Sequence, residues 1–292
     1  MEQTALHRGT GLLWIEAVNS NPNGDPDQAS DPRIRQDKHG VISAVSLKHK
    51  IRQLIAYKEG ALWQEISEEL GIEEKDWNHY DILEQKETSR VAVKKLAPDE
   101  FLYRFWDARV FGTTFLENKE DGSFIHTGVA QFGLGISLSP VEIERMTTTK
   151  EMPAEEGKGK GMAPLAYRIV PYGLYMMPFF INATMAGKTR CSALDIELLL
   201  RILPYAYQET ASYMRAQVNI RHAYYVEHRR ARGGYSDFKI LEALTPKSLL
   251  NDAEEPAKSI ADYDTEAVER RILQLNQQMD QKAGPVRDLV ES

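Results

Sequence analysis

The sequence predicts an α+β fold of the ferredoxin-like kind, and three observations support this class. The 292 residues are 42% hydrophobic and 27% charged, which is ordinary globular usage and excludes wholesale disorder, collagen and a coiled-coil rod. Strand-like and helix-like segments follow one another in the order β, α, insertion, β, hairpin, β, α, β, with no internal repeat. Segregated strands and helices with split connections favour the α+β class.

A dense turn separates the first expected strand from the first expected helix. Gly11–Val18 is an apolar run bounded by turn formers, which predicts a buried strand. Asn19–Asp27 is crowded with Asn, Asp and Pro, and predicts a rigid loop whose side chains bond their own backbone. Ser43 or Ser46 then caps a helix that runs to about Tyr57. The core-facing stripe of this helix has the spacing i, i+4, i+7, i+8 and consists of Leu47, Ile51, Leu54 and Ile55.

Two insertions interrupt the middle of the chain. Residues 58–106 are acidic and predict small helices placed between core elements. Val129–Leu138 alternates apolar with small or polar residues and predicts a strand. Residues 143–170 predict a long hairpin, because two β-prone arms flank a glycine–lysine tip at Gly157–Gly161.

The next part of the chain predicts a strand and a long helix. Leu174–Asn182 has the composition of a core strand. Ser192 with Asp195 predicts a capping box at the start of a helix. We expect this helix to continue to about Met214 with a kink at Pro204.

The C-terminal part predicts one more strand, a basic loop and an acidic tail. The strand is expected at Ile220–Val226 and the loop at Arg229–Gly234. Residues 251–292 form the tail, and its amphipathic helix carries the apolar positions Val268, Ile272, Leu275 and Met279. We treat the whole chain, 1–292, as one domain with insertions.

Several features of the sequence bear on its compartment. A single cysteine, Cys191, excludes an internal disulfide and a cysteine-rich zinc cluster. Met1–Thr10 has no apolar h-region, so no signal peptide is expected. No apolar run approaches the roughly 18–20 residues needed to span a bilayer, so no membrane partner is expected. The predicted location is a reducing cytoplasm.

Charge is distributed unevenly along the chain. The formal net charge is −7. Leu62–Glu87 alone accounts for −7 and Asn251–Ser292 for −5, which leaves the rest of the chain at +5. Basic residues gather at Asp31–Lys58 and Arg215–Arg232. Local basic patches of this kind are the electrostatic footprint of phosphate binding, although charge runs are also typical of solvated surfaces.

Familiar catalytic and metal motifs are incomplete. The loop that starts at Asn19 imitates a calcium loop, but its twelfth position is Ser30, where a bidentate Glu is required. Gly187-Lys188-Thr189 lacks the earlier glycine of a phosphate-binding loop. The seven histidines form no tight ligand pair. We therefore expect no metal, no cofactor and no catalytic constellation.

One combination of features does indicate a ligand. The turn-rich loop leads into Pro32-Arg-Ile-Arg35 and then into a helix that carries Lys48, Lys50 and Arg52. Cations near a helix start, where free backbone N–H groups also point outward, suit phosphate groups. The basic hairpin tip and the arginine-rich loop offer further contacts.

These motifs resemble a known family. Asn19-x-Asn-Pro-Asn-Gly-Asp-Pro-Asp27, Pro32-Arg-Ile34 and Val45-Ser-Leu-Lys-x-Lys-Ile-Arg52 are similar to segments of the backbone subunit of CRISPR surveillance complexes. This is the Cascade major subunit of subtype I-C or I-B, in the repeat-associated (RAMP) superfamily. Asp107-Ala-Arg-Val-Phe-Gly112, and the segments that follow it in order, extend the resemblance over roughly Gly11–Leu250.

The resemblance implies an RRM-like palm with a finger insertion and a long thumb hairpin. It implies several copies bound along one crRNA, each holding the RNA backbone and presenting spacer segments to a target DNA strand. Further partners would be a 5′-handle-binding subunit and the large and small Cascade subunits. The residues expected to contact RNA are Asn21, Asn23, Arg33, Arg35, Ser46, Lys48, Lys50, Arg52, Met146, Met152, Lys158, Lys160, Arg168, Arg215, Arg221, Arg229 and Arg230.

Two other functions remain open at this stage. A metal-dependent RNA endonuclease is one, because related type III backbone subunits cut target RNA with a loop aspartate. Its candidates here are Asp25, Asp27 and Asp37. A small-molecule enzyme of α+β fold is the other, although the sequence offers no constellation for it.

Overall fold

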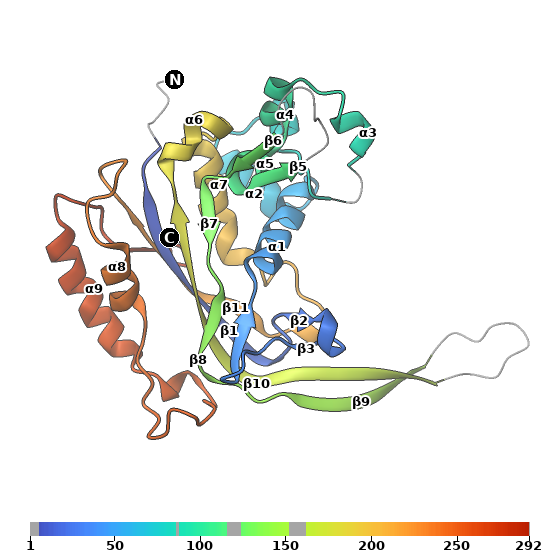
Figure 1. Cartoon of the computed structure of the whole chain (residues 1–292), viewed down its shortest axis with the longest axis vertical. Coiled ribbons are helices and arrows are strands. Elements are labelled where there is room, and N and C mark those ends of the chain that lie inside the picture. The colour runs from blue at the N-terminus through green and yellow to red at the C-terminus, as the bar shows by residue number, and fades with distance from the viewer. Residues whose placement is uncertain (1–5, 86–87, 116–123, 152–161, 292) are drawn as a thin grey trace, which may run out of the picture.

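The computed structural model describes residues 6–85, 88–115, 124–151 and 162–291, and its centre is an antiparallel sheet (Figure 1). The strands follow the order β12-β11-β1-β10-β8-β4, and β7 also pairs with β10. Their bounds are Gly9–Ser20 for β1, His39–Ile42 for β4, Ala130–Phe132 for β7, Gly135–Pro140 for β8, Met162–Ile181 for β10, Val218–Glu227 for β11 and Arg287–Asp288 for β12. The predicted α+β class is confirmed at the level of a mixed fold built on an antiparallel sheet.

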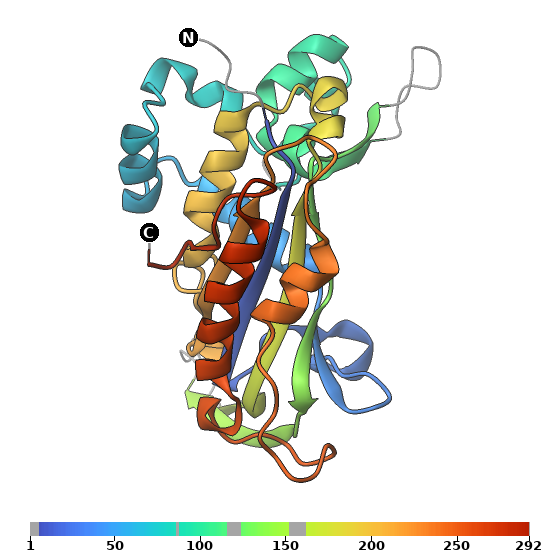
Figure 2. The same cartoon turned by 90° about the vertical axis from the view of Figure 1, so that its left-hand side faces the viewer.

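Helices cover both faces of this sheet, so the centre of the molecule has three layers (Figures 1 and 2). One face carries α1 (Ala44–Ala56) and α7 (Ala193–Ile202), and the other carries α8 (Asp237–Leu244) and α9 (Thr265–Met279). The acidic tail is therefore a layer of the fold, since Val268, Leu275 and Met279 of α9 are buried against the sheet.

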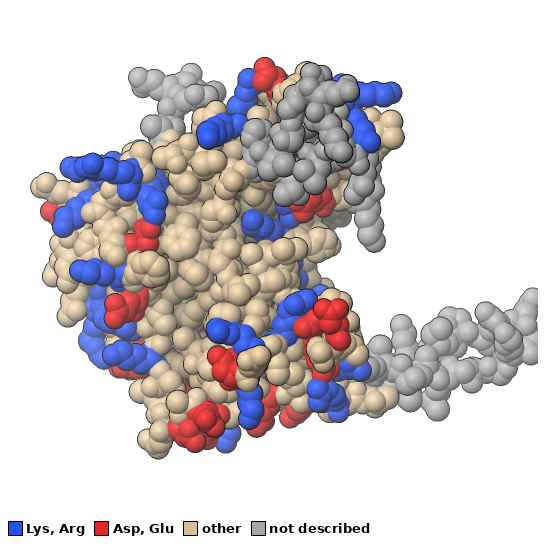
Figure 3. All heavy atoms as spheres, in the orientation of Figure 1, with Lys and Arg blue, Asp and Glu red and all other residues tan. Residues whose placement is uncertain are grey.

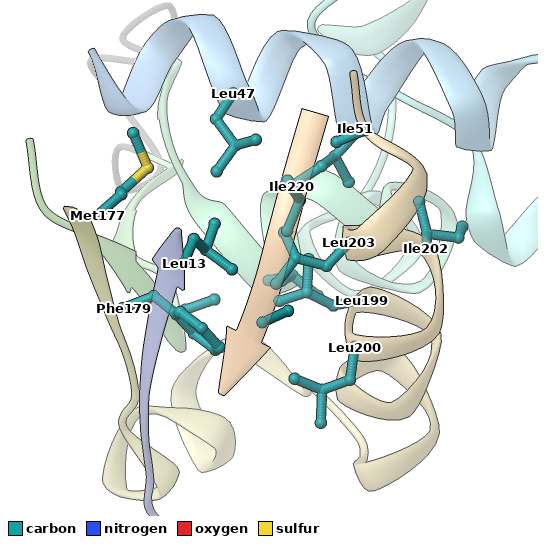
Figure 4. Packing of buried hydrophobic residues seen from close by; sticks show 14 of the residues in the cluster. Leu13, Leu47, Ile51, Met177, Phe179, Leu199, Leu200, Ile202, Leu203 and Ile220 are labelled. Carbon is teal, nitrogen blue, oxygen red and sulfur yellow. The ribbon is translucent and has the colours of Figure 1, made fainter. Parts of the chain in front are cut away.

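The apolar run of the first strand follows from this layering. Leu13 and Ile15 face the core under α1 and α7, whereas Leu12 and Trp14 face the core under α8 and α9. A strand buried on both faces has no polar side and is continuously apolar. Figure 4 shows how residues of α1, α7 and three strands interlock in the first of these cores.

Two helix starts were predicted correctly, whereas one helix end was not. Ser43 caps α1 by accepting from the backbone N–H of Ser46, and Ser192 with Asp195 forms the expected capping box of α7. The prediction that α7 reaches Met214 is wrong, because the helix ends at Ile202. The proline ring of residue 204 has no N–H for the helical ladder, and a short 3-10 turn, η4 (Leu203–Tyr205), replaces the helix there.

The strands around the hairpin also differ from the prediction. The strand expected at Val129–Leu138 is two strands, β7 and β8, separated at Gly133 and Leu134. The hairpin arm and the core strand expected at Leu174–Asn182 are one continuous strand, β10, of 20 residues. Its first part pairs with β9 (Glu144–Glu151), from Met162 opposite Glu151 to Ile169 opposite Glu144. The tip, 152–161, lies outside the described residues.

The acidic region 58–106 folds as a small helical unit beside α1. It contains α2 (Ala61–Glu69), the 3-10 helix η2 (Glu74–Tyr80), α3 (Arg90–Val93) and α4 (Pro98–Arg104). Part of this unit has its own apolar cluster, which includes Val93, Phe101 and Phe105. The short helix α5 (Trp106–Phe111) and the hairpin β5 (Gly112–Phe115) with β6 (Phe124–Thr127) follow it.

Two buried ion pairs on α5 join the acidic unit to the core. Arg109 bonds both carboxylate oxygens of Asp195 on α7, at 2.7 and 3.1 Å. The same guanidinium donates to backbone carbonyls of the acidic unit, including that of His79 at 2.8 Å. Asp107 accepts from Arg52 of α1 at 2.8 Å and from the backbone N–H of Leu83 at 2.7 Å. Asp107 and Arg109 of the motif Asp107–Gly112 thus have a structural role, which the sequence alone did not reveal.

Candidate nucleic-acid interface

The turn between β1 and α1 is held by its own side chains, as expected for Asn19–Asp27. Asn21 is buried and donates to the carbonyl of Ser30 at 2.8 Å. The side-chain oxygen of Asn23 accepts from the backbone N–H of Ser43, the cap of α1, at 2.7 Å. Both asparagines therefore shape the loop and fix its position on α1.

The root of the hairpin is fastened to this loop through Asp31, in strand β3 (Asp31–Pro32). Its carboxylate accepts from Arg145 of β9 at 3.1 Å and lies 3.4 Å from Arg168 of β10. The hydrogen bond from Arg145 lowers the pKa of Asp31, against the opposing effect of burial. Arg168 also donates to the carbonyl of Ala29. Arg168, an expected RNA contact, is thus engaged in holding the hairpin.

A groove of about 600 Å³ lies between α1 and the segment 208–215. Lys50 lines it and donates to the Thr210 hydroxyl at 2.8 Å, and its ammonium lies over the ring of Tyr207. Arg215, in the 3-10 helix η5 (Tyr213–Arg215), lines the same groove and donates to the carbonyl of Asn21 at 3.1 Å. Ser46, another expected contact, is part of the same lining.

The two cations of this groove are not neutralised by ion pairs. Within the described ranges, no carboxylate lies within ion-pair distance of Lys50 or Arg215. Burial, and secondarily the charge of Arg215, lowers the pKa of Lys50 to about 8. Glu209 also lines the groove, but it is not paired with either cation, and two cations held close together create a positive potential that favours an anion.

Lys48 and Arg52 lie on the other edge of α1, above the ring of Phe111. Burial, and secondarily the charge of Arg52, lowers the pKa of Lys48. Arg52 is buried and bound to Asp107, with Glu84 at 3.1 Å. The expected contact of Arg52 with phosphates stays a prediction, and in this structure its guanidinium joins α1 to the acidic unit.

An aromatic pair lies between the hairpin root and the groove, and the sequence did not single it out. Tyr167 of β10 packs edge-on against Tyr213, with ring centroids 5.5 Å apart. Tyr213 is 61% exposed and is two residues from Arg215. An exposed ring beside cations is the arrangement with which proteins stack single-stranded bases. The signal available in the sequence was a tyrosine two residues before an arginine within a polar loop.

Figure 3 shows that the right-hand side of the molecule is hollowed between the part that carries α3, α4, β5 and β6 and the part that carries β2 and β3. Arg33 and Arg35 follow β3 in the chain, and Arg33 is 3.5 Å from Asp25 and Arg35 is 3.8 Å from Asp37. Met146 projects from β9 and is exposed. Three expected contacts, Met152, Lys158 and Lys160, lie outside the described residues.

The remaining arginines are not part of the lining of the groove between α1 and segment 208–215, and their expected RNA contacts stay predictions. Arg221 of β11 is paired with Glu16 at 2.8 Å, and Glu16 in turn accepts from Tyr172 of the second core. Arg229 and Arg230 follow the end of β11 that pairs with Gly9, the far end of β1. Since β1 has 12 residues, that end is about 36 Å from the loop after Ser20.

The loop aspartates of the endonuclease hypothesis make local contacts. Asp25 accepts from the backbone N–H of Asp27 at 3.1 Å, and Asp37 accepts from that of His39 at 3.2 Å. Among the described residues, no three His, Cys, Asp or Glu side chains come together as metal ligands would. None of the helices in the described ranges is both long and apolar enough to cross a membrane.

The fold and this surface define an α+β protein with a hollow that displays unpaired cations and an exposed ring. A family model described as CRISPR-associated protein Cas7 matches residues 7–268. The chain therefore belongs to the Cas7 family, which confirms the resemblance seen in its motifs. A search of curated proteins finds no match.

Solved structures give a second comparison. The chain is similar to one described as "CRISPR RNA-guided surveillance complex, pre-nicking", with 14% identity over 94% of this chain and 90% of that chain, and a TM-score of 0.53. Another, described as "CRISPR RNA-guided surveillance complex", gives 13% identity, 93% and 86% coverage and a TM-score of 0.45. At its level of identity, the first similarity shows a shared fold.

Proposed function

We propose that this protein is a non-catalytic backbone subunit of a type I surveillance complex, bound in several copies along a guide RNA. The central sheet would serve as the palm, the acidic unit as the fingers and β9 with β10 as the thumb. Each copy would hold the RNA backbone and present spacer segments to a target DNA strand. Subtype I-C or I-B, the other Cascade subunits as partners and a cytoplasmic location stay predictions.

The observation that carries this proposal is the pair of cations without carboxylate partners, Lys50 and Arg215, beside the exposed ring of Tyr213. Phosphate contacts and stacking do not read base edges, so they accept any guide sequence. Sequence recognition can then be left to base pairing between guide and target. Membership of the Cas7 family supports the same conclusion.

Coexpression with a repeat–spacer transcript tests the proposal directly. Size-exclusion chromatography with light scattering and absorbance at 260 and 280 nm would measure the mass and RNA content of the product. A nuclease-protected assembly with a regular number of copies per RNA is the expected result. An RNA-free monomer, also when the remaining Cascade subunits are coexpressed, would contradict it.

The endonuclease is the alternative, and it makes a different prediction. It requires magnesium-dependent cleavage of bound target RNA at regular intervals, abolished by Asp25→Ala, Asp27→Ala or Asp37→Ala. The local contacts of Asp25 and Asp37 favour a structural role for these carboxylates. Intact target RNA after incubation with magnesium would support the non-catalytic assignment.

Stacking of a base on Tyr213 predicts a loss of RNA affinity that is independent of salt, unlike the loss of a phosphate contact. Tyr213→Ala should weaken binding of a short single-stranded RNA about tenfold, because one base stack contributes about 1–3 kcal/mol. Tyr213→Phe should bind like the unchanged protein, and the salt dependence should be the same in all three. Tyr103→Ala, which removes an exposed tyrosine of α4, is the matched control. An equal loss in Tyr213→Phe and Tyr213→Ala would contradict stacking.

The low pKa of Lys50 predicts a pH dependence. With a pKa of about 8 in the free protein, the side chain is charged at pH 7 and mostly neutral at pH 9. RNA phosphates bind the charged form, so affinity should fall by about tenfold as pH rises from 7 to 9. Fluorescence anisotropy with a labelled short RNA would measure this fall. Lys50→Arg, whose charge does not titrate in this range, should flatten the profile; the same fall in that variant would exclude Lys50 as its cause.

A further inference from the structure

A basic projection lies on the α8 side of the sheet, away from the proposed RNA hollow. It consists of Arg229, Arg230 and Arg232, in the loop after β11, and Phe238, in the first turn of α8; we call it the knob. Phe238 is 83% exposed, because α8 turns Ile240 and Leu244 toward the core.

The knob has an unbalanced charge within its own chain. Asp237, which precedes Phe238, is already bonded to Arg8 and to the Thr10 hydroxyl, and Glu227, two residues before Arg229, forms no ion pair with the arginines. Within the described ranges, the three arginines have no carboxylate at ion-pair distance. A single exposed aromatic residue is ordinary, but an exposed aromatic residue that follows an arginine-rich loop has the composition of an interface centre.

A surface of complementary character lies on the acidic unit. A shallow groove of about 360 Å³ opens between α2 and η2, and we call it the slot. Ile72 and Trp77 give it apolar walls, and Glu68 lines it together with Glu73, which is paired with Lys75. The surrounding segment, Leu62–Glu87, carries a net charge of −7. The slot is thus suited to an apolar ring accompanied by cations.

The knob and the slot of one chain cannot meet. The unit that forms the slot packs beside α1 and α7, on one face of the sheet, whereas α8 covers the other face (Figures 1 and 2). The folded sheet lies between them. A contact between two different surfaces of identical chains is head-to-tail, and its repetition extends an assembly instead of closing a dimer.

We propose that the knob of one copy docks in the slot of the next copy along the guide RNA. This inference rests on the proposed function, because the RNA brings the copies together. One buried aromatic side chain covers about 150–250 Å², far less than the roughly 800 Å² per partner of a stable interface. The contact therefore sets the spacing of copies that already share an RNA, where their effective concentration is high.

Two RNA lengths separate the docking of neighbouring copies from the binding of RNA by each copy. A long guide RNA accommodates several copies, whereas a short RNA holds one. Phe238→Asp should reduce the cooperativity of binding to the long RNA at least about tenfold, as expected for an interface centre. Its affinity for the short RNA should be unchanged. Leu273→Asp, which places the same charge at a 66% exposed leucine of α9, should leave both unchanged.

Charge exchange provides an independent test. Arg229→Glu with Arg230→Glu should impair assembly, and Glu68→Arg with Glu73→Arg should impair it as well. All four changes in one chain should restore the number of copies per long RNA, since each knob then meets a slot of opposite charge. Glu65→Arg with Glu74→Arg, on the same unit but outside the slot, is the control.

Two results would overturn the inference. One is normal cooperativity in Phe238→Asp together with no restoration by the charge exchange. The other is loss of single-stranded DNA binding in Arg229→Glu with Arg230→Glu while the copy number stays normal, which would make the knob a nucleic-acid site. Failure of the unchanged protein to bind the short RNA would instead contradict the proposed function.

Discussion

Asp195→Ala is expected to lower the free energy of unfolding by about 3–5 kcal/mol, the typical cost of leaving one member of a buried ion pair without its partner. Asp195 is buried, and its loss leaves the guanidinium of Arg109 without a counter-charge. It also removes the capping box of α7. A domain is stable by about 5–15 kcal/mol, so this one change removes a large share.

Urea denaturation would measure the effect, provided that the slope of the transition is unchanged. Asp195→Asn keeps the shape and the cap but removes the charge, so its destabilisation should be smaller. Glu197→Ala, in the same helix, is the control. It breaks an exposed i,i+4 pair with Arg201 and should cost no more than about 0.5 kcal/mol. If Asp195→Ala and Glu197→Ala lowered the free energy of unfolding equally, the ion pair between Asp195 and Arg109 would not stabilise the fold.

Lys50→Met combined with Arg215→Gln should weaken binding of a short RNA by at least about a hundredfold at moderate salt. Each change removes one charge-assisted contact, worth about 1.5–3 kcal/mol, while methionine keeps the apolar stem of Lys50. Two lost phosphate contacts should also lower the slope of log affinity against log salt by about 1.4. Titrations at several salt concentrations would measure both quantities.

Arg229→Ala with Arg230→Ala is the matched control, because it removes the same charge at the far end of β1. The Debye length at physiological salt is about 8 Å, so these arginines should affect the short RNA less than about twofold. Comparable losses in the two double variants would mean that net charge alone attracts the RNA. The groove between α1 and segment 208–215 would then not be its binding site.

Local sequence signals predicted local structure well. The cap of α1 at Ser43, one of the two serines considered, the capping box at Ser192 and the arms of the hairpin depend on residues close in the chain, and these predictions are confirmed. The short elements β4 and β12 and the helix α8 were not predicted, because a few residues carry too little periodicity. The prediction of the end of α7 required knowing whether Pro204 bends the helix or stops it. Tertiary packing decides between the two, and the sequence near Pro204 does not show it.

The candidate site was less predictable, because it depends on which distant segments meet. Lys50 and Arg215 are 165 positions apart and share one groove, whereas Arg215 and Arg229 are near in sequence and lie at opposite ends of the sheet. Arg52 follows Lys50 by only two positions in α1, but its guanidinium is paired with Asp107 of α5. Composition could indicate phosphate binding, but only tertiary contacts separate free cations from paired ones.

The continuity of β10 restricts how the hairpin can change in length. Its outer half pairs with β9 and its inner half fills the central sheet, with no break between them. Side chains of a strand alternate between two faces, so an added residue between the arm and the core turns every later side chain to the opposite face. Lengths that grow by two residues in each arm preserve the faces and extend the reach by about 7 Å. An odd insertion between the arm and the core would therefore invert the surface that the arm offers, whereas an insertion of two residues would keep it.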